Sequence, residues 1–502
     1  MIALAKQQPE AIKAAKRFDP YTGAPIYDAP RADQTRHVRA SYDNAKTTDD
    51  NRRHWAQADG LDADSANSKA VRQTLVRRSR YEVSNNGFLD GIVQTLATDL
   101  VGVGPKLRMI TGVDRFNQAV EYAFGRWAKA VLLRRKLWCL AHAKVQDGEA
   151  FGVVRENPKV RDRVKLDLVL FEGEQCASPQ LPWMQAGYID GIKFDEFGNP
   201  EWYDVLKYHP GASLQFLTLE PERVSADKIV HWFQLRRPGQ HRGVPEFRST
   251  LGVGASSRRF REAVVAAAEV AADFAVLLEQ SNDMGDDGDY ATPLSTMEIE
   301  KRMMTALPDG TKPYQMKAEH PNATYESFTR SQNNELARPK SMPYNKAACD
   351  SSSYNYASGR LDHQTYYASI DVDREDGSDL VLDVLFRQWW RAAVNAYGWQ
   401  GDENEPPDHA WDWPKHPVAD VVSEATANNI KLRNGSLTLT QLYSLDGEDF
   451  EDHIAKMAVD YGVTVDEMRR TLLNAIMNAQ NQQASQTQAE AQKQQAEAAT
   501  SA

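Results

Sequence analysis

The longest regular pattern of apolar positions lies in the middle of the chain, over residues 255–280. Apolar and small side chains recur there three or four positions apart, which is the period of a helix. The stripe consists of Phe260, Val264, Ala267, Ala268, Ala271, Phe274, Ala275 and Leu278. Small side chains let a neighbouring helix approach closely. The pattern therefore predicts either an ordinary core helix or one helix of a helical barrel.

The residues before this helix alternate between helical and strand-like patterns. Helical spacing indicates one helix over 68–100 with a break at 85–87, and another over 113–141. Alternation with a period of two then predicts five strands, over 145–155, 164–172, 188–194, 202–208 and 229–233. A turn at 195–199 predicts a β-hairpin over 187–208. The fold class is therefore α+β, preceded by a polar, extended arm over 1–55.

The residues after the central helix are mostly helical. A helix is predicted over 326–338, a polar loop over 349–358, and strong helical spacing over 380–397, with Trp389 and Trp390 as core anchors. Residues 401–419 have a loop composition. Short helices are expected over 420–432, 440–443, 448–461 and 464–479, the last beginning with a capping box at Thr464 and Glu467. The tail 480–502 has too few apolar residues to build a core.

Charge and cysteine content narrow the possible functions. The net charge is −11, which argues against a protein that grips DNA phosphates with lysine and arginine. Cys139, Cys176 and Cys349 are odd in number and far apart, which favours a reducing compartment and buried thiols over disulfides. No apolar run approaches the roughly 18 residues of a membrane span.

A group of arginines, Arg72, Arg77, Arg78 and Arg80, lies in the first half of the 68–100 helix. These side chains predict either a solvated basic face or a contact surface for acidic partners.

Motifs that would indicate catalysis or cofactor binding are missing from the sequence. It contains no GxxxxGK[ST], HExxH, CxxC or GxSxG motif. The glycines of 102–105 lack the third glycine of a dinucleotide site, and 281–289 lacks the spacing of a calcium loop. His409 and His416 are interpreted as surface histidines. We therefore expect no catalytic residue, no metal and no cofactor, and an architectural protein instead of an enzyme.

A series of stretches resembles, in order, the phage portal proteins of the lambda family. The match extends over about 50–400 and more loosely to 470; Pro339 and Pro343 interrupt the helix that the family places before the loop at Tyr354. The stretches that carry it are 54–61, 67–86, 99–105, 190–200, 229–245 and 354–360. The resemblance implies a predominantly helical portal fold with an α/β wing, a helical stem, a small mixed clip and a helical C-terminal crown.

The family layout assigns each part of the chain to a region of a ring, usually of twelve subunits. The implied parts are an N-terminal arm 1–55, wing 56–254, first stem helix 255–280, clip 281–325, second stem helix 326–343, channel loop 344–357, long wing helix and loop 358–419, crown 420–479 and tail 480–502.

The implied site residues fall into three groups. The stem packing residues are Val264, Ala268, Ala271 and Ala275. The residues implied to dock terminase and then neck proteins are Asp283, Asp286, Asp287, Asp289, Glu298 and Lys301. The residues implied to face DNA in the channel are Ser351, Ser352, Ser353, Tyr354, Asn355, Tyr356 and Ser358. For this loop the alternative is a buried segment whose tyrosines fill the core.

The resemblance implies a portal at one capsid vertex, through which double-stranded DNA is packaged and ejected. Its partners would be further copies of itself, the terminase large subunit, neck or adaptor proteins, the scaffold, the major capsid protein and the passing DNA, with no membrane. It would be assembled in the host cytoplasm and reside in the virion. The alternatives are another structural head or neck protein, and an enzyme acting on nucleic acid.

Overall fold

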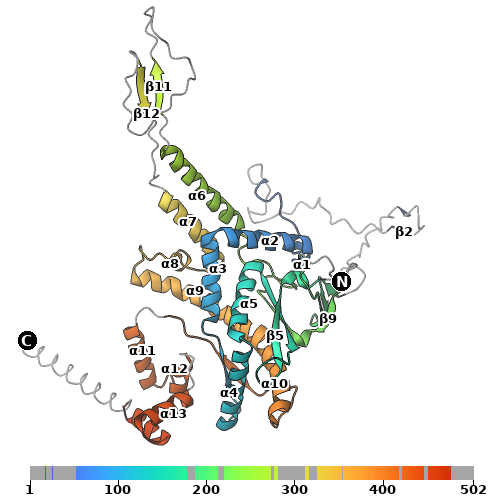
Figure 1. Cartoon of the computed structure of the whole chain (residues 1–502), viewed down its shortest axis with the longest axis vertical. Helices are drawn as coiled ribbons and strands as arrows, with labels where there is room; N and C mark the ends of the chain where they lie inside the picture. The colour runs from blue at the N-terminus through green and yellow to red at the C-terminus, as the bar shows by residue number, and fades with distance from the viewer. Residues whose placement is uncertain are drawn as a thin grey trace, which may run out of the picture. The chain divides into compact units, whose positions relative to one another are not determined.

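The computed structural model describes residues 52–177, 187–212, 220–272, 325–352, 354–417, 421–445 and 450–475, together with the backbone of four short strands (Figure 1). It divides into two units, residues 1–61 and 62–502. In the first unit, strands β1 (Arg17–Phe18) and β2 (Pro25–Ile26) pair antiparallel. Everything that follows concerns the second unit.

The N-terminal helices follow the predicted apolar spacing, with one additional break. They are α1 (Ala63–Ala66), α2 (Lys69–Asn85), α3 (Gly87–Val101), α4 (Asp114–Ala130) and α5 (Leu133–Asp147). The predicted break between α2 and α3 is confirmed, because the Asn86 side chain accepts a hydrogen bond from the Phe88 amide and caps α3.

The single helix predicted over 113–141 is wrong, because the chain turns at Leu132 and starts a second helix. Leu132 has a φ of 56°, a left-handed conformation that branched side chains rarely adopt and that the sequence therefore does not signal. The second helix, α5, continues to Asp147, past the position where a strand was predicted to begin.

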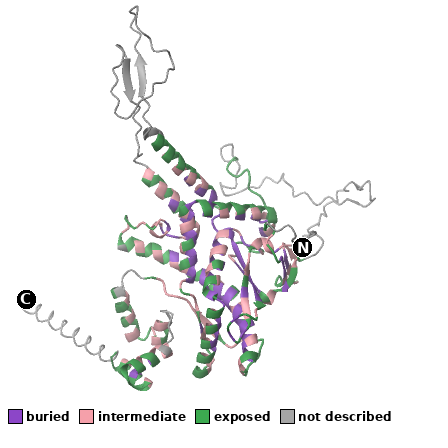
Figure 2. Ribbon diagram, in the orientation of Figure 1, coloured by how far each residue is buried: buried purple, intermediate pink, exposed green. Residues whose placement is uncertain are grey.

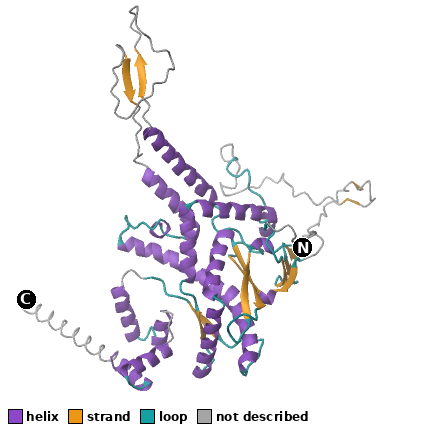
Figure 3. Ribbon diagram, in the orientation of Figure 1, coloured by secondary structure: helices purple, strands orange, loops and turns teal. Residues whose placement is uncertain are grey.

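The strands form small antiparallel sheets (Figure 3). One sheet has the order β10-β4-β5, made of β4 (Glu149–Glu156), β5 (Leu166–Phe171) and β10 (Ile229–Phe233). A second has the order β6-β7-β8-β9, made of β6 (Tyr188–Ile189), β7 (Ile192–Phe194), β8 (Pro200–Val205) and β9 (Glu222–Ser225). The predicted hairpin is confirmed as β7 and β8. The strand predicted over 188–194 is itself a hairpin, because Asp190 and Gly191 both have positive φ.

A third pairing joins β3 (Lys106–Met109) to β13 (His409–Asp412), so the loop predicted over 401–419 contains a strand. The sequence could not indicate it, since four residues between prolines at 407 and 414 carry little pattern and the partner strand lies about three hundred positions earlier. The surface assignment of His409 and His416 is also corrected. His409 is half-buried, with its ring 4.4 Å from that of Phe386, and His416 stacks on Tyr367 with ring centroids 4.2 Å apart.

The main core lies where α3, α4 and α5 meet a continuous helical run (Figure 2). This run consists of α9 (Tyr356–Gly377), a π-helical segment η6 (Ser378–Leu382) and α10 (Asp383–Tyr397). Trp389 and Trp390 are fully buried, which confirms them as core anchors. Cys176 is buried as predicted. Cys139 and Cys349 are exposed, so the prediction of buried thiols is wrong for both, one lying on the solvent face of α5 and the other in a loop.

Helices α6 (Leu251–Ala272) and α7 (Tyr325–Ala337) lie side by side and are called the helix pair below (Figure 1). Phe260 on α6 stacks on Tyr325 and meets Phe328 edge to face. The helix predicted over 255–280 is wrong at its C-terminal end. Strand β11 (Val276–Gln280) pairs there with β12 (Thr311–Gln315), and a short apolar run does not distinguish strand from helix.

The predicted second helix corresponds to α7, followed by a 3-10 turn η5 (Arg338–Lys340) and a short helix α8 (Tyr344–Ala347). Pro339 lies at the start of η5. A proline lacks the amide hydrogen that a helix needs, so the α-helix ends before it.

The C-terminal helices are α11 (Val421–Arg433), α12 (Leu439–Leu445), α13 (Phe450–Tyr461) and a last helix over 465–475. Ile454, Ala458 and Met468 form a small core of their own. The predicted capping box is confirmed, since the Glu467 amide donates to Thr464 Oγ1 and the Thr464 amide donates to Glu467 Oε2. Among the described residues, no helix has the length and apolar character needed to cross a membrane.

Candidate functional site

The helix pair leaves much of the α6 surface uncovered. Near its start, α6 contacts α2 through Arg258, whose Nη2 lies 3.2 Å from a carboxylate oxygen of Glu82. Further along, Val264 is half-buried, while Val265 and Ala268 are exposed. The backbone at Ala271 continues the helix; its side chain and all of Ala275 lie outside the described residues. A partly apolar helix face therefore remains open in the single chain.

The predicted channel loop is shorter than expected. Residues 344–347 form α8 and Tyr356 already begins α9, so the loop is confined to 348–355. The correction has a local cause, because the Asn355 side chain accepts a hydrogen bond from the Ser358 amide at 2.8 Å and caps α9.

The side chains of this loop differ in how far they are buried. Ser351, Ser352, Asn355 and Ser358 are exposed and Tyr354 is half-buried. Ser353 and the side chain of Tyr356 lie outside the described residues, as do all the predicted docking residues, Asp283, Asp286, Asp287, Asp289, Glu298 and Lys301.

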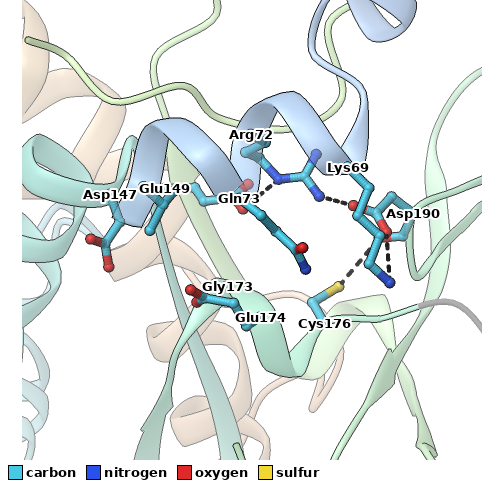
Figure 4. Close-up of a pocket in the computed structure, with 10 residues that line it drawn as sticks. Lys69, Arg72, Gln73, Asp147, Glu149, Gly173, Glu174, Cys176 and Asp190 are labelled. Carbon is cyan, nitrogen blue, oxygen red and sulfur yellow. Dashed lines mark hydrogen bonds and ion pairs between the residues drawn. The ribbon is translucent and has the colours of Figure 1, made fainter. Parts of the chain in front are cut away.

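A buried cluster of charges, called the arginine cluster, joins α2, β4 and the segment before α6. Figure 4 shows its members Arg72, Glu149 and Asp190. Arg242 is 1% exposed and donates through Nη2 and Nε to the two carboxylate oxygens of Glu149, at 2.7 and 2.9 Å. Arg72 forms ion pairs with Glu149 and Asp190. Two guanidinium groups thus balance two carboxylates.

The electrostatics of the arginine cluster are consistent with permanent charges. Burial alone would raise the pKa of Glu149, but Arg242 and a hydrogen bond with His231 hold it well below its ordinary value. Burial and the neighbouring Arg242 lower the pKa of Arg72 to about 10. The Glu149 carboxylate and the Arg72 guanidinium therefore stay charged near neutral pH, as a structural ion pair requires.

The arginine cluster corrects the interpretation of the arginines on α2. Arg72 is buried, and Arg80 forms ion pairs with Asp147 and Glu174 at 2.7 and 3.1 Å. Arg77 and Arg78 alone of the four are exposed. The helical spacing does indicate this difference among the four arginines. Arg72 and Arg80 lie on the side of α2 that also buries Val76 and Val83.

Within the described residues, one group of side chains has the donor types of a metal site. Glu172, Glu174 and His209 have ligand atoms close enough to meet on one ion. The Arg80 guanidinium lies 2.9 Å from Glu172 and 3.1 Å from Glu174, so it already supplies the positive charge between the carboxylates.

A second buried group, called the lysine tetrad, lies at the base of the helix pair. Lys144 Nζ is 3.0 Å from Glu246 and 2.9 Å from Asp373, and Lys340 Nζ is 2.9 and 2.6 Å from the same two residues. All four side chains are at most 4% exposed. Burial would raise the pKa of Glu246, but the two lysines lower it overall.

The tetrad brings together the segment that precedes α6 and the segment that follows α7. Glu246 precedes α6, Lys340 follows α7, Lys144 belongs to α5 and Asp373 belongs to α9. The chain therefore leaves for the helix pair and returns from it at the same cluster of charges.

The comparison with protein families decides the identity. The model of the lambda family of phage portal proteins matches residues 49–374. This chain belongs to the lambda family of phage portal proteins. The match includes both charge clusters and the helix pair, and it ends within α9.

Comparison with solved structures found portal and neck proteins at low similarity. A chain of the virion of a native gene transfer agent particle is 13% identical, with 75% of this chain and 93% of that chain covered and a TM-score of 0.38. A chain from the neck of that native particle, computed with C12 symmetry, is 14% identical, with 76% and 94% covered and a TM-score of 0.36. An HK97 family portal protein from Corynebacterium diphtheriae is 12% identical, with 59% and 84% covered and a TM-score of 0.23. The comparison with curated proteins found no match.

Three of the six stretches that resemble portal proteins meet in the arginine cluster. Arg72, Asp190, His231 and Arg242 come from three separate stretches of that resemblance and lie within one hydrogen-bonded group. The portal motif residues in this region therefore hold the α/β part of the chain together.

Proposed function

We propose that this portal protein is the subunit of a ring at one vertex of the capsid, through which double-stranded DNA is packaged and later ejected. Family membership is the observation that carries the proposal. The open face of α6 supports it, because a ring needs a heterologous contact in which one subunit covers a surface that its neighbour leaves exposed.

In this proposal the helix pair is the stem, the β11–β12 side of it leads to the clip, and residues 348–355 face the channel. The chain's net charge of −11 suits a conduit, since many lysine contacts to phosphate would hold DNA in place instead of letting it pass. The energy for packaging then comes from a terminase docked at the clip, and the portal itself is not an enzyme.

Electron microscopy of the purified protein in negative stain tests the proposal directly. The expected images show rings with a central hole. A uniform population of monomers or of solid particles at micromolar concentration would exclude the proposed assembly.

The stem assignment predicts the effect of placing larger side chains on the open face of α6. Ala268→Leu combined with Ala271→Leu should overpack the contact between neighbouring subunits, a change that typically costs about 1–3 kcal/mol per site. Mass photometry should show a shift from rings to monomers. Ala130→Leu, an exposed change at the end of α4, is the matched control and should leave rings intact. Rings in both variants would contradict the stem assignment.

The channel assignment predicts a separate defect for Tyr354→Ala combined with Tyr356→Ala. Rings should assemble normally, and the fraction of particles that retain their DNA should fall, because the loop and the first residue of α9 would lose their contacts with the passing DNA backbone. Sedimentation of particles in a density gradient measures that fraction. If the double variant instead fails to fold or assemble, the tyrosines fill the core, as the alternative interpretation holds.

A further inference from the structure

The loop between β4 and β5, residues 157–165, presents four cations on one surface and is called the basic loop. Lys159, Arg161, Arg163 and Lys165 are all exposed. The residues between them, Val160, Asp162 and Val164, are buried. From Lys159 to Lys165 the chain therefore alternates between solvent and core at every residue, as in a strand, and each solvent position of this stretch carries a positive charge.

Internal contacts hold the basic loop in this arrangement. Its ends are joined by a hydrogen bond from the Asn157 amide to the Lys165 carbonyl, at 2.6 Å. The Asp162 carboxylate has no side-chain exposure; it accepts from the Val164 amide at 3.1 Å and from Arg126 Nε at 2.8 Å. The single acidic side chain within the loop is thus used inside the fold, so it does not neutralise the cations outside.

The neighbouring elements add little negative charge. Arg126 and Lys129 on α4 are exposed. Asp167, the first acidic residue after the loop, is 3.1 Å from Asn157 Nδ2 and ion-paired with Lys136. Among the described residues, Lys159, Arg161 and Arg163 take part in no ion pair, while Glu156 is an exposed acid at the loop's edge. The chain has a net charge of −11, so a surface with this many cations outside ion pairs differs in charge from the chain as a whole.

The long helical run fixes where the basic loop lies relative to the channel end of the chain. Arg163 lies over the ring of Tyr397, the last residue of α10, at 5.1 Å. The opposite end of the same run is Tyr356, beside the segment proposed to face DNA. At about 1.5 Å per residue the run separates the two ends by roughly 60 Å. If the proposed function holds, the basic loop therefore faces away from the channel.

We propose that the basic loop is a docking surface for an acidic segment of another virion protein. Charge complementarity supports this partner, because fixed cations at alternate positions suit carboxylates on an extended chain. A protein segment is favoured over nucleic acid, since the passing DNA lies at the other end of the helical run and the chain as a whole repels phosphate.

A binding measurement on the full-length chain tests the proposal. The probe is a fluorescent peptide of about twenty glutamates, followed by fluorescence anisotropy at low salt. Lys159→Glu combined with Arg161→Glu should weaken binding at least tenfold, and added salt should weaken binding to the unaltered protein by screening. Arg77→Glu combined with Arg78→Glu is the matched control. It reverses two exposed cations on α2 and should leave the affinity unchanged.

The outcomes separate this inference from the proposed function. Rings in electron microscopy, together with equal peptide binding by the loop variant, would overturn the docking surface alone. Preferential binding of a 20-base-pair DNA duplex over the peptide, lost in the loop variant, would make the surface a nucleic-acid site and also overturn it. Lys159→Gln combined with Arg161→Gln should show an intermediate loss, and unchanged melting temperatures exclude misfolding as the cause.

Discussion

Lys340→Met is expected to lower the free energy of unfolding by about 3–5 kcal/mol. The substitution removes one cation of the lysine tetrad and leaves Glu246 and Asp373 to share Lys144 in a site where all the side chains are at most 4% exposed. An uncompensated buried carboxylate is far more costly than a broken surface pair, because neither water nor salt can stabilise it. The midpoint of urea unfolding, followed by tryptophan fluorescence, measures the loss.

Two companion variants show whether the loss comes from charge. Lys129→Met changes an exposed lysine on α4 and should alter the unfolding free energy by less than about 0.5 kcal/mol. Lys340→Met combined with Asp373→Leu removes one charge of each sign and leaves Lys144 paired with Glu246, so it should recover part of the stability. Asp373→Leu alone completes the comparison. If the double variant loses as much unfolding free energy as Lys340→Met and Asp373→Leu added together, the tetrad is not an interacting unit.

Lys340→Met should also loosen the packing of the helix pair without unfolding the rest of the chain. Lys340 lies in the turn after α7, and its ion pairs fix the returning chain to Asp373 on α9 and to Glu246 in the segment before α6. Hydrogen exchange should therefore become faster in α7 than in α3, which lies in the main core. Equal exchange rates in α7 of both proteins would mean that helix packing alone holds the pair.

The elements that the sequence predicted well have strong local signals. The spacing of apolar residues predicted the break at Asn86, the helix α7 and the helical run through Trp389, and the capping pair Thr464 and Glu467 marked the start of the last helix. The ordered stretches of family resemblance predicted the portal family correctly. For the helices and the capping pair, the information lies within a window of a few tens of residues, whereas the family resemblance depends on the order of stretches along most of the chain.

The features that the sequence did not predict depend on distant partners. Strand β13 exists because β3 lies beside it, and β11 is a strand because β12 pairs with it. The lysine tetrad draws on four segments far apart along the chain, so nothing near Lys144 or Lys340 indicates that either will be buried. Arg72 differs from these features, because it lies on the side of α2 that buries Val76 and Val83 and so had a local signal; only its partners, Glu149 and Asp190, lie far along the chain.

Gly243→Ala is expected to destabilise the fold strongly, although it adds only one methyl group. A Cβ at this position would lie 2.1 Å from the carbonyl oxygen of Gly148 and 2.6 Å from the Cβ of Glu149. Gly148 faces it in turn, because a Cβ there would lie 2.0 Å from the carbonyl carbon of Val244. Two backbone segments therefore touch with no room for a side chain on either, and one segment must move.

The movement would separate charges as well as atoms. The Gly243 amide donates to Glu149 Oε2 at 2.9 Å, and the preceding residue, Arg242, holds both oxygens of the same carboxylate. Displacing this segment would strain or break the arginine cluster, so overpacking and the loss of buried ion pairs would add to more than about 4 kcal/mol. The expected result is a sharp fall in soluble yield and, for what remains soluble, a lower midpoint of urea unfolding.

Gly252→Ala is the matched control for this prediction. It adds the same methyl group within α6, where nothing lies within 4 Å of the new atom, and should stabilise the helix by roughly 0.5–1 kcal/mol. Opposite effects from the same chemical change would show that the close approach at Gly243, and not the loss of glycine flexibility, is responsible. An unfolding midpoint for Gly243→Ala equal to that of the unaltered protein would mean that the two segments can separate freely, and that the arginine cluster does not fix their position.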